Sequence, residues 1–392
     1  MRSLLRDRLA QRQGIAGLIA QLTQAAAGLG IILAVREAGG SLSLAGGAAA
    51  AFLIATGAAR PLQGRLIDRH GPPPVLIPCA AIHLAGFGGL VAWTQLEGGS
   101  WPVILFAIPI GLGEPPVSAS MRIAWGRMAG AEDRTAAYSA VTLTQEVAVL
   151  LGPLLLAVVV AVASAAAAVL VVGGLASAGT VVLATVMPRR LHAEPPSRQD
   201  SAMRSRGVQV ALAVNLFFAL ALGCVELGIP ALAGDRGVPA LSGVMLGVMS
   251  VGGVLGALVY AARRWGLTAS ARLALLLAVY TVMMFPLIGT PSFALMAIPL
   301  LLAGAALNPV VTTVALLVED HAGAAAAEGF GWQSTSLAVG AAAGNALSGP
   351  LAQHHGASAA FAAAAIAATV ATILAILARR TLTTGQPANP TY

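Results

Sequence analysis

Long apolar runs separated by short polar stretches follow one another along the whole chain. Twelve of these runs are long enough to cross a bilayer as an α-helix, since about 20 apolar residues span the hydrocarbon core. The runs cover residues 14–35, 43–62, 75–94, 102–123, 136–160, 165–187, 207–233, 241–262, 271–289, 293–318, 330–352 and 357–378. The pattern predicts an all-α membrane protein with twelve transmembrane helices.

The composition supports membrane insertion and narrows the chemistry. Of the 392 residues, 58% are hydrophobic and only 9% are charged, which is too little charge to coat a soluble protein of this length. The chain has no lysine, which excludes a P-loop ATPase and a Schiff-base enzyme. Cys79 and Cys224 lie inside apolar runs and the six histidines form no zinc pattern, so no metal or other cofactor is expected.

Arginine is distributed asymmetrically along the chain. With the N-terminus inside, 20 of the 22 arginines, Arg60 and Arg122 among them, lie at or near the cytoplasmic side, and only Arg36 and Arg236 lie outside. Basic residues concentrate on the cytoplasmic side of membrane proteins. We therefore expect a multi-pass protein of the plasma or inner membrane with both termini cytoplasmic. The asymmetry also accounts for the formal net charge of +7 without a nucleic-acid partner.

The chain divides into two halves that resemble each other. The polar stretch 188–206 carries five arginines and three prolines and separates residues 1–187 from residues 207–392. Three motifs recur in the same order at an offset near 195: GRLIDRHG (64–71) with GALVYAARRWG (256–266), GEPPVSAS (113–120) with LNPVVTTV (307–314), and LLGPLL (150–155) with LSGPLA (347–352). These repeats predict two pseudo-symmetric six-helix bundles joined by a cytoplasmic linker, with the substrate path between them.

The stretch GRLIDRHG places two arginines, an aspartate and a histidine in the cytoplasmic loop predicted between the second and third spans. It resembles the signature loop of the major facilitator superfamily, G-x-L-x-D-R-x-G, whose motif residues here are Gly64, Asp68, Arg69 and Gly71. The Asp68 carboxylate is suited to a helix N-terminus, where the dipole favours an anion. The resemblance implies that Asp68 contacts the start of the eleventh span, near residues 329–333, and holds a cytoplasmic gate shut. The alternative is a charged turn that only enforces topology.

The sequence departs from the family pattern in both halves of the chain. Prolines at 72–74 replace the basic residues that follow the motif, which removes charge contacts to acidic groups or lipid phosphates. In the second half Tyr260 stands where an aspartate would, although Gly256, Arg263 and Arg264 are kept. Only the first half therefore carries the complete motif.

Three glutamates lie inside predicted spans: Glu114, Glu146 and Glu226. A charged side chain at the bilayer centre costs roughly 2.5–3.5 kcal/mol on insertion scales, so each glutamate is a candidate for function. A carboxyl group can bind and release a proton as its exposure to solvent changes, which predicts proton coupling or substrate contact. The alternative for each is a buried structural hydrogen bond or ion pair.

Helical spacing places other polar residues on the same faces as these acids. In the fifth span a stripe about 100° wide is expected to face a cavity and consists of Tyr138, Thr142, Gln145 and Glu146. In the seventh span Glu226 shares a face with Asn215. Further inward-facing candidates are Gln21, Gln24, Asn308, Thr312, Trp332, Gln333 and Ser336, of which Trp332 is equally suited to be an interfacial anchor.

In the fourth span Glu114 shares a stripe with Ser118 and Arg122. Pro115 and Pro116 should bend that helix and break the stripe. Arg122 lies near the cytoplasmic end of the span and is expected to extend out of the membrane.

These features predict a secondary active transporter that moves a small organic solute by alternating access. Proton-coupled export of an amphipathic or cationic compound is favoured, because the candidate cavity combines acids with apolar groups and no arginine is evident at its centre. Gly152-Pro153 resembles the antiporter motif of the family, although Leu156 and Ala157 replace its final glycines. The expected partners are a small-molecule substrate, a proton and the bilayer, and the protein is expected to be monomeric.

Two other functions stay open. The first is an importer or facilitator for a sugar, nucleoside, carboxylate or other polar metabolite. The glutamine and asparagine residues of the candidate cavity would suit polyols, whereas the lack of an arginine at its centre argues against anionic substrates. A membrane-embedded enzyme or sensor has neither a nucleophile–base cluster nor a metal pattern in its support.

Overall fold

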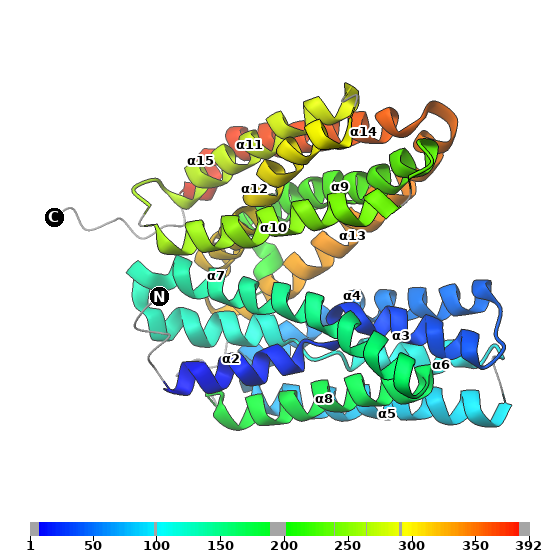
Figure 1. Ribbon diagram of the computed structural model, residues 1–392. Helices are drawn as coiled ribbons and strands as arrows, with labels where there is room; N and C mark the ends of the chain where they lie inside the picture. The colour runs from blue at the N-terminus through cyan, green and yellow to red at the C-terminus, as the bar shows by residue number, and fades with distance from the viewer. Residues whose placement is uncertain are drawn as a thin grey trace. The chain divides into compact units, whose positions relative to one another are not determined.

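The computed structural model describes residues 8–97, 100–188, 201–238, 240–263, 265–289 and 292–383, and every regular element within these ranges is a helix (Figure 1). Nine stretches of the described chain are long and apolar enough to cross a membrane, and one of them, Phe293–His355, contains two helices. The prediction of an all-α membrane protein is confirmed. The number of twelve spans stays a prediction.

The chain forms two compact units. Unit 1 comprises Met1–Ala137 and Val141–Ser197, and unit 2 comprises Tyr138–Ala140 and Arg198–Tyr392. Residues 189–200, which make up most of the predicted linker 188–206, lie outside the described residues. The predicted limits of the two bundles, 1–187 and 207–392, stay a prediction.

Unit 1 holds seven described helices. They are α2 (Arg8–Ala20), α3 (Thr23–Glu37), α4 (Leu42–His70), α5 (Pro73–Glu97), α6 (Val103–Leu112), α7 (Val117–Val162) and α8 (Ala165–Val186). Apolar clusters between α3, α4, α5, α6 and α8 form its core, with Phe52 and Phe87 among the largest fully buried side chains.

Unit 2 begins with a short 3₁₀ helix, η1 (Ala202–Arg204), and a second one, η2 (Gly323–Ala325), precedes α13. Its α-helices are α9 (Arg206–Asp235), α10 (Ala240–Ala262), α11 (Ala269–Gly289), α12 (Phe293–Ala322), α13 (Ala326–His355), α14 (Ala357–Leu377) and α15 (Arg379–Thr383). Glycines allow two of its helix pairs to pack backbone against backbone. A Cβ on Gly256 of α10 would lie 2.0 Å from Ala305 O of α12, and one on Gly344 of α13 would lie 2.1 Å from Leu220 O of α9.

The first predicted span is interrupted, which the apolar pattern does not indicate. α2 ends at Ala20 and α3 begins at Thr23. Between them the Gln21 N–H is shared between Gly17 O and Leu18 O, both at 3.2 Å, and the Gln21 side chain also donates to Gly17 O at 2.9 Å. α7 packs against this interruption, because a Cβ on Gly152 would lie 2.2 Å from Leu22 O.

Two predicted loops are helical instead. The motif GRLIDRHG was expected in a loop, but α4 continues through it to His70 and ends at Gly71, which has φ 82° and donates its N–H to Ile67 O at 2.8 Å. Likewise α7 runs without interruption from the fourth predicted span into the fifth. Neither stretch contains a proline, and a helix that leaves the bilayer continues until its sequence stops it.

Candidate functional site

The fourth predicted span breaks at Gly113-Glu114-Pro115-Pro116, between α6 and α7. Pro115 and Pro116 have no N–H, so the carbonyl groups of Gly111 and Leu112 lack their usual helical donors. The Glu114 N–H donates to Gly111 O at 3.2 Å and thereby leaves Ile110 O without a donor as well. The expected bend is therefore a full interruption, which leaves backbone acceptors that other groups must satisfy.

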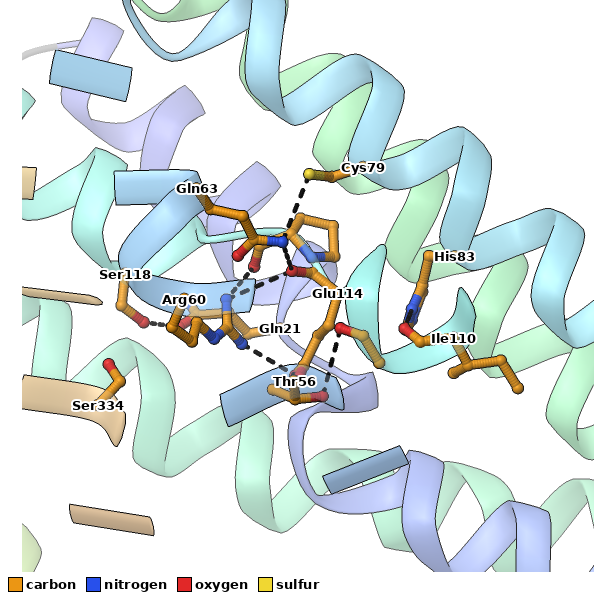
Figure 2. Close-up of polar contacts among 12 residues, drawn as sticks. Gln21, Thr56, Arg60, Gln63, Cys79, His83, Ile110, Glu114, Ser118 and Ser334 are labelled. Carbon is orange, nitrogen blue, oxygen red and sulfur yellow. Dashed lines mark hydrogen bonds and ion pairs between the residues drawn. The ribbon is translucent and has the colours of Figure 1, made fainter. Parts of the chain in front are cut away.

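Side chains from α4 and α5 supply the missing donors (Figure 2). His83 Nδ1 lies 2.7 Å from Ile110 O, and Gln63 Nε2 donates to Leu112 O at 2.9 Å and to Glu114 O at 3.1 Å. Thr56 Oγ1 donates to Gly111 O at 3.4 Å. An unpaired buried carbonyl costs about 1–3 kcal/mol, so these hydrogen bonds stabilise the interrupted backbone.

Arg60 and Glu114 form an ion pair at this interruption (Figure 2). Arg60 Nη2 lies 3.1 Å from Glu114 Oε2, and only 16% of the arginine side chain and 7% of the glutamate side chain are exposed. Arg60 Nη1 also donates to Pro115 O at 3.0 Å. One guanidinium thus neutralises the carboxylate and holds the backbone beside it.

The sequence analysis counted Arg60 among the arginines at or near the cytoplasmic side, and that assignment stays a prediction. α4 extends to His70, so Arg60 lies about 15 Å along the helix before its last residue. Arg122, which was expected to extend out of the membrane, is buried, with 5% of its surface exposed, whereas Arg60 is half-buried. Arg122 Nη2 donates to Gln145 Oε1 at 3.4 Å.

The two interrupted helices of unit 1 are joined directly. Ser118 in the first turn of α7 donates from its hydroxyl to Gln21 Oε1 at 2.8 Å, and Gln21 lies at the interruption between α2 and α3 (Figure 2). Discontinuous helices with polar side chains at the break are typical of substrate and ion sites in transporters. The Arg60–Glu114 pair and the Ser118–Gln21 bridge together define the candidate site.

His83 has one ring nitrogen that the described structure leaves unpaired. Ile110 O can only accept, so Nδ1 carries the proton of this hydrogen bond, and Nε2 of a neutral ring is then an acceptor. Nε2 is buried without a hydrogen-bond partner among the described residues. The sequence analysis missed Arg60, Gln63 and His83, although all three are polar residues in or beside apolar runs, which is the signal that selected the glutamates.

The predicted stripe of the fifth span lies on the continuous helix α7. Tyr138 and Thr142 are buried, with 0% and 3% of their surfaces exposed, while Gln145 and Glu146 are half-buried. Gln145 accepts the hydrogen bond from Arg122, and Gln24 of α3 is exposed on unit 1.

The candidates of unit 2 fall into two groups. Asn215 of α9 is fully buried and donates to Gln333 O at 3.1 Å and to Ser336 Oγ at 2.8 Å, both in α13. Gln333 Nε2 in turn donates to Val311 O of α12 at 3.0 Å. Glu226 is instead exposed on α9, so the structure does not bring it into the Asn215 network.

Three candidates of unit 2 remain. Asn308 and Thr312 of α12 are buried, with 2% and 1% of their surfaces exposed. Asn308 packs against α10, where a Cβ on Gly253 would lie 3.0 Å from its Nδ2. Trp332 of α13 is half-buried.

The four motif residues lie at the end of α4. Asp68 is buried, with 3% of its surface exposed, whereas Arg69 is half-buried. Gly64 is buried, and Gly71 has the positive φ that ends the helix. No group of three or more His, Cys, Asp or Glu suited to a metal ion occurs in the described ranges.

Apolar helices of spanning length, paired interruptions and a buried ion pair define a multi-pass membrane protein of the transporter class. The sequence profile of the Major Facilitator Superfamily matches residues 14–336, and the chain belongs to this family. It is a transporter and not an enzyme. Comparison with functionally curated protein sequences finds no match.

Solved transporters share the fold at low sequence identity. A bacterial homologue of the iron transporter ferroportin, in an outward-facing state, superposes with a TM-score of 0.75 at 14% identity, covering 95% of this chain and 99% of its own. The Escherichia coli fucose:proton symporter FucP gives 0.70 at 15%, covering 94% and 98%. The human organic anion transporter MFSD10 gives 0.68 at 18%, covering 95% and 96%. At these identities the likeness concerns the fold alone.

Proposed function

We propose that this transporter is a secondary active carrier that moves a small organic solute by alternating access, coupled to protons. Two pseudo-symmetric bundles of six spans each would rock about a central site, with both termini on the cytoplasmic side of the plasma or inner membrane. Family membership, the repeat between the halves and the arginine asymmetry support this arrangement.

The observation that carries the coupling proposal is the buried Arg60–Glu114 pair at an interrupted helix. A proton on Glu114 would cancel one charge of the pair while Arg60 keeps its hydrogen bond to Pro115 O. Proton binding would therefore weaken the attachment of α4 to the interruption without abolishing it. Such a change can shift the balance between two conformations of α6 and α7.

Glu146 and Glu226 are the other candidate coupling residues. Glu146 is half-buried on α7, next to the Gln145 that accepts from Arg122. Glu226 is exposed on α9 and is better placed to contact substrate than to hold a proton away from water. The structure therefore favours Glu114 first, Glu146 second and Glu226 third.

Export remains the proposed direction, and an amphipathic solute the proposed cargo. The half-buried Arg60 and the buried Arg122 of unit 1 are positive groups that weaken the sequence argument against anionic substrates. An importer of a carboxylate or another polar metabolite is therefore the second candidate, and these two arginines are the observation that favours it.

Reconstituted protein tests the coupling. Proteoliposomes that contain a pH-sensitive dye are exposed to a panel of organic cations, carboxylates and sugars, and proton movement is recorded for each compound. Glu114→Gln should abolish compound-driven proton movement while downhill compound exchange persists, and Glu146→Gln is tested beside it. The control is Glu37→Gln, because Glu37 caps α8 through the Ala166 N–H and lies away from the interruption. Full compound-driven proton movement in all of Glu114→Gln, Glu146→Gln and Glu226→Gln would place the proton site at another residue. Transport of a compound by the wild type without any proton movement would replace proton coupling by facilitated diffusion or another ion.

Cysteine labelling tests the orientation. Ser100→Cys and Ser197→Cys, each in a background without Cys79 and Cys224, should react with an impermeant reagent from opposite sides of the membrane. Labelling of the Ser197→Cys variant in intact cells would refute the proposed topology.

A further inference from the structure

A shallow cavity of about 680 Å³ lies where α14 passes into α15, and its lining is Ile376, Leu377, Arg379, Arg380 and Thr383. α14 is a candidate membrane span, and its 21 residues make it about 31 Å long. That length matches the hydrocarbon core of a bilayer, so the cavity lies at the boundary between the core and the lipid headgroups.

α15 is fixed to the rest of unit 2 although it has only five residues. Leu382 is completely buried, and Thr381 O lies 3.2 Å from the Nε2 atom of His321 in α12. The hydroxyl groups of Thr383 and Ser270 of α11 are 3.0 Å apart. These contacts hold one face of α15 inward, and the adjacent Arg379 and Arg380 remain exposed.

Among the described residues, the two arginines have no acidic partner. Within the described part of the chain, neither guanidinium group forms an ion pair or a hydrogen bond. The sequence that follows, TGQPANPTY, contains no acidic side chain. Guanidinium groups bind phosphate oxygens through two parallel hydrogen bonds, so this pair is suited to a phosphate ligand.

The remaining large side chains of the lining are apolar and exposed. Ile376 is 53% exposed and Leu377 is 76% exposed, at the last turn of the spanning helix α14. A ligand that covers both the arginines and these apolar side chains must join an anionic group to a hydrocarbon chain. A membrane phospholipid has this structure, with the phosphate at the depth of the arginines and the acyl chains at the depth of the leucine.

We propose that this cavity binds the headgroup of an anionic phospholipid, with the phosphate between Arg379 and Arg380 and an acyl chain against Ile376 and Leu377. Basic residues that directly follow a spanning helix, and basic pockets between such helices, are recurrent forms of anionic lipid recognition. The site is separate from the Arg60–Glu114 pair of unit 1. It depends only on the membrane insertion of α14, so the proposed substrate and coupling can fail without affecting it.

Native mass spectrometry of the delipidated full-length protein tests the site. The protein is titrated in detergent with phosphatidylglycerol and with phosphatidylcholine of the same acyl chains. The wild type should bind phosphatidylglycerol more tightly. Each arginine near an anionic lipid contributes about fivefold, so Arg379→Gln/Arg380→Gln should weaken phosphatidylglycerol binding about thirtyfold and leave phosphatidylcholine binding unchanged. Leu377→Ser should weaken the binding of both lipids.

Arg36→Gln/Arg236→Gln is the matched control, because it removes the same net charge elsewhere and should leave the lipid preference intact. Equal losses in the two double variants would attribute the preference to net charge and overturn the site. Unchanged phosphatidylglycerol affinity in Arg379→Gln/Arg380→Gln would also overturn it. Competition by inorganic phosphate at concentrations similar to those of the lipid would mean a site for free phosphate and not for phospholipid.

Discussion

Replacing Arg60 should lower the free energy of unfolding much more than replacing Glu114, although the two side chains form one ion pair. Arg60→Gln removes the only charge that the described structure places against the carboxylate, together with the hydrogen bond to Pro115 O. Removing one partner of a buried ion pair costs about 3–5 kcal/mol, because the other charge stays desolvated. Glu114 is 7% exposed, so water cannot solvate the remaining carboxylate without rearrangement of the interruption.

Glu114→Gln should lower the free energy of unfolding much less than Arg60→Gln does. The amide keeps the shape of the side chain and can still accept from Arg60, and the arginine retains its bond to Pro115 O. A hydrogen bond to a charged group contributes about 1.5–3 kcal/mol, and part of it survives in this variant. The double variant Arg60→Gln/Glu114→Gln should be more stable than Arg60→Gln alone, since no unpaired carboxylate remains.

Unfolding free energies of the four proteins, measured in one detergent, give the coupling energy between the two side chains. We expect it to lie at the upper end of the range of about 0.5–3 kcal/mol seen for residues in direct contact. The control cycle combines Arg60→Gln with Glu37→Gln, which should be additive because Glu37 contacts the start of α8. Additivity of Arg60→Gln and Glu114→Gln within about 0.5 kcal/mol would refute the ion pair as the organising contact of the interruption.

Three other changes test the structure by thermal unfolding or transport. Gly256→Ala should destabilise unit 2 by about 1–3 kcal/mol, since its Cβ would lie 2.0 Å from Ala305 O. Gly247→Ala, which has open space around it, should be neutral or stabilising. Equal effects of the two substitutions would contradict the close packing of α10 and α12. His83→Phe should lower the free energy of unfolding by about 1–3 kcal/mol, because it leaves Ile110 O unpaired. His83→Asn should lower it less, because its amide can still donate. The reverse order would contradict the hydrogen bond. Asp68→Asn should leave the protein folded but slow transport. The expected contact of this carboxylate with a helix terminus would contribute about 0.3–1 kcal/mol if exposed and up to about 2 kcal/mol if partly buried. An unchanged transport rate would mean that the motif only sets the topology.

The sequence alone predicted the membrane class, the disruption of the fourth span and the candidate residue Glu114. Long apolar runs identify the all-α membrane class, because a bilayer requires helices of fixed length whatever their packing. The prolines at 115 and 116 indicate a disruption of the fourth span, because a missing N–H acts at its own position. Glu114 was selected because a charged residue in an apolar run is costly wherever the helix packs.

Only the tertiary structure decided which groups meet. Arg60 is 54 residues from Glu114 along the chain, and the apolar run of α4 ends near it although the helix continues to His70. The interruption at Gln21 depends on a hydrogen bond of its own side chain and on the approach of Gly152, neither of which alters the apolar pattern. Periodicity reports the local environment of each helix, whereas an ion pair across two helices depends on their packing and on the groups left unpaired where a helix breaks.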